Sequence, residues 1–136
     1  MIVLDASLII AHVLGESTIA VDSSIFDTLK GDKVTVPAHW SAEVASALTN
    51  NARRGRLSRA DITLVLKQID AFDIEFAKPP SVEEMSNLIA FATEKQLTAY
   101  DAAYVMLASG LGAKLATLDN AMRRVAGGLH IEVLPA

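Results

Sequence analysis

The sequence begins Met1-Ile-Val-Leu-Asp5-Ala-Ser7-Leu-Ile-Ile10, and this stretch decides the fold. Residues 2–4 form a short apolar run typical of a buried strand, and the residues from Ser7 onward follow the spacing of a helix. Asp5 stands between them. The opening therefore predicts a strand followed by a helix, with a carboxylate at the junction.

The same alternation continues along the chain. Further strands are predicted at residues 34–36, 73–76, 114–118 and 131–134. Helices are predicted at residues 7–14, 19–30, 39–54, 58–71, 81–95, 100–111 and 120–125. Strands that alternate with helices usually pair in parallel and carry helices on both faces. We therefore expect an α/β fold, a three-layer α/β/α sandwich with a mainly parallel central sheet, as one domain over residues 1–136.

Composition narrows the class of protein. Of the 136 residues, 51% are hydrophobic and 21% charged, a balance typical of one globular domain. The 12 Lys and Arg against 16 Asp and Glu give a net charge of -4, which argues against nucleic-acid binding by bulk positive charge alone. Cysteine is absent, so disulfides and thiolate metal sites are excluded.

We expect a cytoplasmic protein with no signal peptide and no contact with a membrane. The longest uncharged run, residues 102–113, is shorter than the roughly 20 apolar residues that a bilayer span needs. The absence of cysteine also favours a reducing compartment.

Two acids follow predicted strands. Asp5 comes directly after Leu4, and Asp119 comes directly after Leu118. In a parallel sheet, ligands gather beyond the carboxyl ends of the strands, where both acids would lie. Asp is also a favoured helix N-cap, so capping is the alternative role for each.

Two further acids lie on apolar helix faces, Glu43 on one and Asp101 on the other. The face that includes Glu43 also contains Trp40, Val44, Ala47 and Leu48. The face that includes Asp101 also contains Tyr104, Val105 and Ala108. A carboxylate on such a face must be paired, neutralised or bound to a metal. The alternative for Glu43 is an ion pair with Arg53 or Arg54 of a neighbouring turn or subunit. The alternative for Asp101 is a favourable interaction with the helix dipole.

Four acids at one edge of a sheet repel each other unless a cation lies among them. Oxygen ligands favour Mg²⁺ or Mn²⁺ over zinc. A metal with open positions activates water and stabilises displacement at a phosphodiester. The residues therefore predict metal-assisted phosphodiester hydrolysis, with Asp5, Glu43, Asp101 and Asp119 holding the metal directly or through water.

At these residues the sequence resembles the PIN-domain ribonucleases, and among them the VapC-type toxins of type II toxin–antitoxin systems. The resemblance runs along nearly the whole chain. The segments that carry it are Ile2-Val-Leu-Asp5-Ala-Ser7, Val36-Pro-Ala-His-Trp-Ser-Ala-Glu43-Val-Ala-Ser-Ala-Leu48, Arg53-Arg-Gly-Arg-Leu-Ser58, Thr98-Ala-Tyr-Asp101-Ala-Ala-Tyr104 and Leu115-Ala-Thr-Leu-Asp119. One departure is Ser46, which stands where many relatives carry Asn.

The resemblance implies an activity and partners. It implies that the four acids bind Mg²⁺ or Mn²⁺ and cut a structured RNA, such as a tRNA or a ribosomal RNA loop, which stops translation. A cognate antitoxin would cover the active-site groove, and the toxin would form a homodimer within a larger toxin–antitoxin assembly. The resemblance also implies that Ser7 and Thr117 orient the metal or its water, for which an ordinary cap and an ordinary strand Thr are the alternatives.

Six arginines are candidates for contact with RNA phosphates. Four of them, Arg53, Arg54, Arg56 and Arg59, bracket Gly55 at a predicted helix end, and Arg123 and Arg124 follow Asp119. A local basic patch would reconcile RNA binding with an acidic net charge. Capping of a helix C-terminus is the alternative, and it is the favoured one for Arg53 and Arg54.

The histidines and aromatic residues receive no role in the chemistry. The histidines, His12, His39 and His130, have no spacing typical of a metal site or a nucleophile, and we expect them to be structural or exposed. Trp40, Tyr100 and Tyr104 occur at helical spacing, so we assign them to the core or an interface, and not to RNA.

The mean hydropathy of +0.35 is high for a lone domain. Surplus apolar area is expected at Met85, Leu88 and Ile89 and at Leu8, Ile9 and Val13. We expect a second subunit or the antitoxin to cover it.

Two other classes share parts of this pattern. A catalytically silent PIN-like module would bind only protein, but the presence of all four acids argues against it. A phosphoacceptor receiver domain is also a parallel α/β fold with acids at strand ends. It requires adjacent acids after the first strand, where this chain has Asp5 alone.

Overall fold

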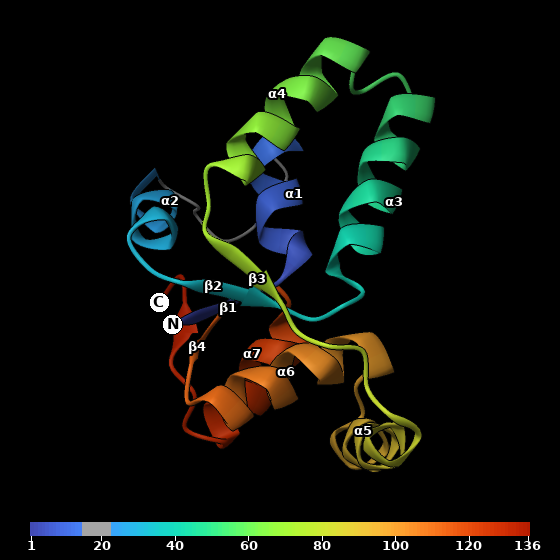
Figure 1. The fold of residues 1–136 in the computed structure, drawn as a ribbon, viewed down its shortest axis with the longest axis vertical. Helices are drawn as coiled ribbons and strands as arrows, with labels where there is room; N and C mark the ends of the chain where they lie inside the picture. The colour runs from blue at the N-terminus through green and yellow to red at the C-terminus, as the bar shows by residue number, and fades with distance from the viewer. Residues whose placement is uncertain (15–22) are drawn as a thin grey trace.

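The computed structural model describes residues 1–14 and 23–136 (Figure 1). One sheet contains the strands β1 (Ile2–Leu4), β2 (Val34–Val36), β3 (Ile74–Phe76), β4 (Lys114–Ala116) and β5 (Val133–Leu134). Neighbouring strands are parallel throughout, in the order β3-β2-β1-β4-β5. The predicted α/β class with a parallel central sheet is confirmed, and β1 is its central strand.

Helices cover both faces of this sheet. The helices are α1 (Ala6–Leu14), α2 (Ser23–Lys30), α3 (Trp40–Arg53), α4 (Arg59–Asp70), α5 (Val82–Lys95), α6 (Ala99–Leu111) and α7 (Asn120–Gly128). Figure 1 shows α1, α3 and α4 on one side of the sheet and α6 and α7 on the other, with α5 outside α6. Helix α6 contacts β1 and β4, and α1 packs against α3. The three-layer sandwich is therefore as predicted.

The predicted element boundaries need small changes. Helix α7 continues to Gly128, three residues past the predicted end, and β4 stops at Ala116. Of the helix predicted at residues 19–30, the structure contains α2 from Ser23, and residues 19–22 lie outside the described part of the chain.

Three helices begin at a hydroxyl N-cap. Ser58, Ser81 and Thr98 each accept a hydrogen bond, 3.1 Å long, from the backbone amide three residues later. Such a cap satisfies an amide that has no partner within the helix, and it stabilises the helix by about 1 kcal/mol. These caps fix where α4, α5 and α6 begin, and α6 carries one of the predicted site acids.

The core lies around β1. Its three side chains and those of β2 are buried, as are Tyr104 and Val105 of α6. Leu8 and Ile9 of α1 are also buried, so the prediction that they form surplus surface was wrong. They are buried where α1 packs against α3 on one side of the sheet.

The other predicted region of exposed apolar side chains, on α5, is present. Met85 is 40% exposed and Ile89 is 62% exposed, whereas Leu88 is partly buried. The side chain of Val13 lies outside the described residues. Within the described chain, none of the helices is long and apolar enough to cross a bilayer.

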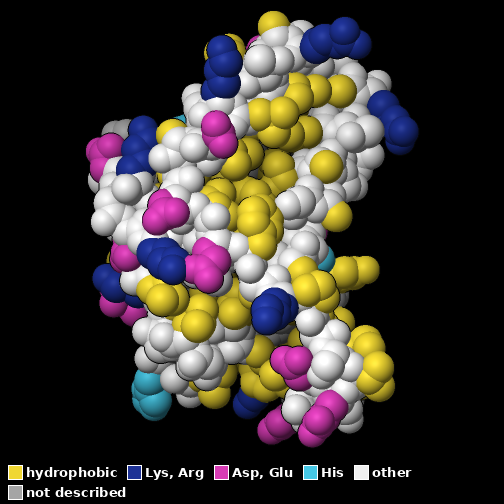
Figure 2. Space-filling model, viewed as in Figure 1, with side chains coloured by type: hydrophobic (Ala, Val, Ile, Leu, Met, Phe, Trp, Pro, Cys, Tyr) yellow, Lys and Arg dark blue, Asp and Glu magenta, His cyan; other side chains and the backbone are white. Residues whose placement is uncertain are grey.

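Helices α3 and α4 form a hairpin that extends beyond the sheet (Figure 1). Its turn includes Gly55, whose φ of 72° lies in the left-handed region that glycine adopts at little cost. Figure 2 shows Lys and Arg side chains at the end of this hairpin and hydrophobic side chains between its two helices.

Candidate active site

The sheet changes winding direction at β1. Strands β2 and β3 lie to one side of β1, and β4 and β5 lie to the other. In open parallel sheets, the carboxyl ends of the two strands at such a switch point border the crevice that binds ligands. The Asp5 amide, directly after β1, donates to the carbonyl of Ala116 at 2.9 Å and so joins the two strand ends.

A pocket of about 240 Å³ opens at this crevice, and all four predicted acids line it. Asp5 follows β1, and Asp119 follows β4. Glu43 lies in the first turn of α3 and Asp101 in the first turn of α6, on opposite sides of the sheet. Four acids that are remote in sequence are thus brought to one pocket.

Asp5 is the most deeply placed acid and is 3% exposed. Its Oδ2 accepts two hydrogen bonds, from the Ser7 hydroxyl at 2.5 Å and from the Thr117 hydroxyl at 2.7 Å. Its Oδ1 has only a long contact with the Ser7 amide, at 3.4 Å. One oxygen is therefore held by the protein, and the other is largely open.

Burial raises the pKa of the Asp5 carboxyl, and the charge of Glu43 raises it further, although the hydrogen bonds from Ser7 and Thr117 act in the opposite direction. The carboxylate is thus costly to keep charged in this pocket.

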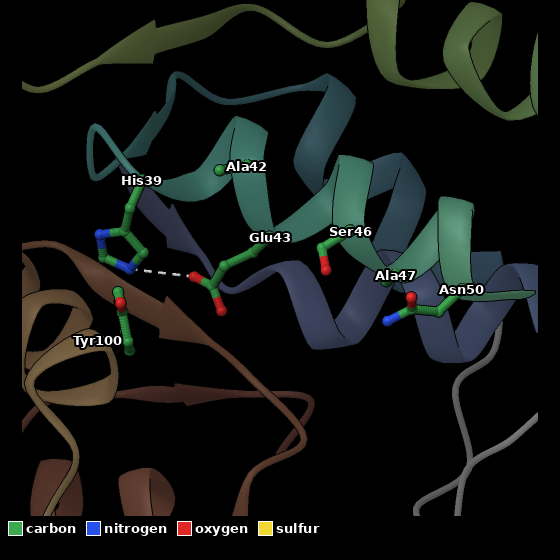
Figure 3. A pocket seen from close by; sticks show the side chains of 7 residues that line it. All are labelled: His39, Ala42, Glu43, Ser46, Ala47, Asn50 and Tyr100. Carbon is green, nitrogen blue, oxygen red and sulfur yellow. Dashed lines mark ion pairs between the residues drawn. The ribbon is translucent and has the colours of Figure 1, made fainter.

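Glu43 is held in a similar way. Its Oε1 accepts a hydrogen bond from the Tyr104 hydroxyl at 2.7 Å. The His39 Nε2 lies 3.0 Å from the same oxygen without forming a hydrogen bond, so the two side chains are in close contact (Figure 3). Among the described residues, no donor reaches Oε2. Within the described chain, Glu43 forms no ion pair with Arg53 or Arg54, and such a pair across a subunit interface stays a prediction.

Tyr104 supports this arrangement through its own ionisation. Burial raises the pKa of its phenol, and the bond to Glu43 raises it further. The hydroxyl therefore stays protonated and donates to the carboxylate.

Asp101 and Asp119 lie on the open side of the pocket. Burial raises the pKa of Asp101, and the charges of Asp119 and Glu43 raise it further. Asp119 is the N-cap of α7, and its Oδ1 accepts from the Met122 amide at 2.8 Å. The predicted capping role of Asp119 is confirmed, and it uses only one of the two carboxylate oxygens.

The donor set is that of a hard cation, because the pocket offers carboxylate oxygens and no thiolate. In the described part of the chain, no three acidic or histidine side chains lie close enough together to hold one ion directly. The residues present therefore fit an ion held by at most two carboxylates, with water as its other ligands.

Comparison with known proteins identifies the family of the chain. The family model for the PIN domain matches residues 2–128. The chain belongs to the PIN-domain family.

Relatives of this PIN domain carry names that describe an activity. It is 37% identical over 78 residues to Ribonuclease VapC3 of Pyrobaculum aerophilum, a match that covers 57% of this chain and 60% of that protein, less than two thirds of its length. It is 29% identical over 128 residues to Ribonuclease VapC12 of Mycobacterium tuberculosis, which covers 93% of each chain.

Solved structures share the fold. The PIN domain superimposes on the crystal structure of PAE2754 from Pyrobaculum aerophilum with a TM-score of 0.71 and 22% identity, covering 98% of this chain and 88% of the other. A domain of a functionally unknown protein from Methanocaldococcus jannaschii matches with a TM-score of 0.52 and 19% identity, covering 97% and 87%.

The candidate arginines of this PIN domain lie in two places. Arg53, Arg54 and Arg56 are exposed at the end of α3, and the ten residues from Glu43 to Arg53 place them about 15 Å away along the helix. Arg123 donates to the carbonyls of Thr117 at 2.9 Å and Pro135 at 2.7 Å, which ties α7 to the last strand. Arg124 is exposed.

Sequence reasoning missed the supports of Glu43. His39 was predicted to be structural or exposed, but it contacts Glu43 from the preceding helical turn, a spacing of four residues that could have signalled the pair. Tyr104 is buried, as predicted, yet its hydroxyl reaches the site. Tyr100 is 63% exposed, so it does not belong to the core, and its predicted alternative place in an interface stays a prediction.

Proposed function

We propose that this PIN domain is a divalent-metal-dependent endoribonuclease, the toxin of a toxin–antitoxin pair, and that it cleaves structured RNA such as a tRNA or a ribosomal RNA loop. The observation that carries the proposal is the convergence of Asp5, Glu43, Asp101 and Asp119 on one pocket at the switch point of the sheet. The ribonuclease names of the two relatives support the choice of substrate class.

At most two of the four acids would hold Mg²⁺ or Mn²⁺ directly, and the others would hold it through water. The ion would supply an activated water and charge stabilisation at the phosphate. Ser7 and Thr117 orient Asp5 by binding one of its oxygens, and Tyr104 does the same for Glu43. We assign no protein nucleophile, because a water activated by the ion would supply the attacking oxygen.

Contact with RNA beyond the pocket is assigned to the exposed cations. Arg53, Arg54 and Arg56 at the end of the α3–α4 hairpin would bind phosphates away from the cleaved bond, and Arg124 would bind nearer to it. Arg123 is already engaged with two carbonyls, so its contribution is to hold α7 in place.

We assign the exposed apolar side chains of α5 to a protein interface. Val82 is 81% exposed and Ile89 is 62% exposed, and leaving such side chains in water is unfavourable. A second toxin subunit would cover α5, and the antitoxin would cover the active-site groove.

The test is cleavage of tRNA and ribosomal RNA fragments by the purified chain with Mn²⁺. Asp101→Asn should lower the rate roughly a thousand-fold, because several kcal/mol of transition-state stabilisation depend on the metal site. The matched control is Glu83→Gln, which removes one exposed acid from α5 and should leave the rate unchanged.

Two results would contradict the proposal. Undiminished cleavage by Asp101→Asn would remove this acid from the chemistry. Binding of Mn²⁺ in a calorimeter without cleavage of any RNA would instead make the chain a silent interaction module. Circular dichroism of both variants checks that they are folded.

A further inference from the structure

A second pocket adjoins the acidic one. It has a volume of about 480 Å³ and lies along α3, facing the start of α6 (Figure 3). The two pockets share Glu43 and Ala47 as lining residues. A group bound in the second pocket would therefore lie directly beside a group bound among the four acids.

The charge of the second pocket excludes a phosphate as its ligand. Glu43 lines it, and neither Lys nor Arg is among the described lining residues. A phosphate would be repelled by the carboxylate and would find no cation to bind. A neutral planar group that offers hydrogen-bonding edges fits this lining better.

Tyr100 supplies a flat apolar surface at this pocket. Its side chain is 63% exposed, which is unusual for an aromatic residue in the first turn of a helix that packs on the sheet. Its ring lies 5.3 Å from that of His39 at an interplanar angle of 60°. His39 also packs edge-on against Tyr104, at 5.3 Å and 79°. The exposed ring is thus backed by an aromatic chain that ends in the core.

Polar side chains follow the same face of α3. His39, Glu43, Ser46 and Asn50 are spaced by four, three and four residues, which places them in one row along the helix. Figure 3 shows Ser46 and Asn50 on the pocket side of α3, beyond Glu43. An Asn amide and a Ser hydroxyl are groups that pair with base edges.

We propose that this second pocket binds the base of an unpaired ribonucleotide next to the cleaved phosphate, with the base against the Tyr100 ring and its edge toward Ser46 and Asn50. The inference rests on the proposed ribonuclease function. It makes Tyr100 a substrate-binding residue. Ser46 does not line the acidic pocket, so we assign it a contact with the base and no part in metal binding.

The test compares Tyr100→Ala with Tyr100→Phe on a short single-stranded RNA that contains the mapped cleavage site. Loss of one stacked base typically weakens binding about ten-fold, so Tyr100→Ala should raise KM by about that factor. Tyr100→Phe keeps the ring and should stay within about two-fold of the wild type. The affinity for Mn²⁺, measured by calorimetry, should be the same in all three proteins, because Tyr100 does not line the acidic pocket.

A second substrate isolates the base. In this RNA, a nucleotide beside the cleaved phosphate lacks its base, on the 5′ side in one version and on the 3′ side in the other. One version should lower kcat/KM of the wild type about ten-fold and have no further effect on Tyr100→Ala, because the ring and the base would act as a pair.

Three results would overturn the proposal. Equal kinetics of Tyr100→Ala and Tyr100→Phe would show that the ring does not bind RNA. If removal of the base lowered kcat/KM of Tyr100→Ala by the same factor as that of the wild type, the ring and the base would act independently and would not be in contact. Unchanged RNA kinetics with weaker self-association of Tyr100→Ala in sedimentation would make the ring a protein contact.

Failure of the ribonuclease proposal can be recognised separately. If the wild type binds Mn²⁺ but cuts no RNA, the same variants are compared by fluorescence anisotropy with a labelled single-stranded RNA. A ten-fold weaker Kd for Tyr100→Ala alone would support the base pocket without catalysis, and equal Kd values would overturn it.

Discussion

Helix α4 begins with Ser58 and carries Asp61 three residues later, and α6 begins with Thr98 and carries Asp101 at the same distance. In both helices the N-cap hydroxyl accepts from the Asp amide at 3.1 Å. The two carboxylates then differ. Asp61 turns back to accept from the Ser58 amide at 2.8 Å, whereas among the described residues no backbone amide donates to Asp101.

This difference separates an acid whose charge is favoured in the folded state from one whose charge is disfavoured there. Hydrogen bonds from Ser58 lower the pKa of Asp61, so the folded state favours its charge. Burial and the neighbouring carboxylates raise the pKa of Asp101, and Asp5 has the same pattern. Such an unfavourable charge is typical of a functional site, where stability is lost for the sake of activity.

The largest effect should come from adding metal. If the acidic pocket binds Mn²⁺, an ion concentration a hundred-fold above Kd should stabilise the folded chain by about 2.7 kcal/mol. A thermal melt with and without Mn²⁺ measures this gain. Asp61→Asn should keep the whole gain, and Asp101→Asn should lose most of it.

The comparison between the two helices would break if both variants responded to Mn²⁺ alike. Equal gains would mean that the ion binds elsewhere, and no gain in either would mean that the Asp61 end also contributes to binding. A melt with Ca²⁺ or Na⁺ at matched ionic strength separates specific binding from screening.

Neutralising a carboxylate should raise the free energy of unfolding in the acidic pocket and lower it at the N-terminus of α4. Asp5→Asn should raise the free energy of unfolding at pH 7 by about 0.5–2 kcal/mol, the usual size of a stabilising change at a functional site. The amide carbonyl can take the place of Oδ2 and accept from both Ser7 and Thr117, so the hydrogen bonds survive. Asp61→Asn should lower the free energy of unfolding instead.

The pH dependence of unfolding tells whether each carboxylate, Asp5 or Asp61, lowers or raises the stability of the folded chain. The pKa of Asp5 is higher in the folded chain than the 3.8 of the unfolded chain, so the wild type loses stability as the pH rises from 3.8 to the folded pKa. The extra stability of Asp5→Asn over the wild type should therefore be smaller near pH 4 than at pH 7. The folded pKa of Asp61 is lowered, so its contribution is present above 3.8 and is lost as pH falls through that pKa. Urea unfolding between pH 3 and pH 7 measures both, and a gain for Asp5→Asn that grows toward low pH would contradict the argument.

The sequence was sufficient to predict the layers of the fold and the convergence of four acids at one edge of the sheet. Residues 2–4 are all apolar and are buried on both faces, which is the pattern of a strand inside a parallel sheet. Residues 34–36 are buried in the same way, although Thr35 is polar. The acids were found because two of them follow strands and two interrupt apolar helix faces. Both signals are local, so they can be read without knowledge of tertiary contacts.

The supports of the acids depend on contacts that the sequence does not display. The hydroxyl of Tyr104 bonds to Glu43 across 61 positions, and that of Thr117 bonds to Asp5 across 112. The sequence also cannot tell which of two aromatic residues in one helical turn faces outward. Tyr100 and Tyr104 were assigned alike, yet one is exposed and the other is fully buried.

The smallest effect should come from removal of the two N-cap hydroxyls. These two caps, Ser58 of α4 and Thr98 of α6, have the same geometry. Ser58→Ala and Thr98→Ala each remove one hydroxyl with the same 3.1 Å bond, so each should lower the free energy of unfolding by about 1 kcal/mol. Only Thr98→Ala should also slow RNA cleavage, because the first turn of α6 positions Asp101 in the acidic pocket. Urea unfolding and cleavage rates on the same samples test the pair. Equal loss of activity in both would mean that stability alone controls the rate, and unchanged activity in both would mean that Asp101 keeps its position without the cap.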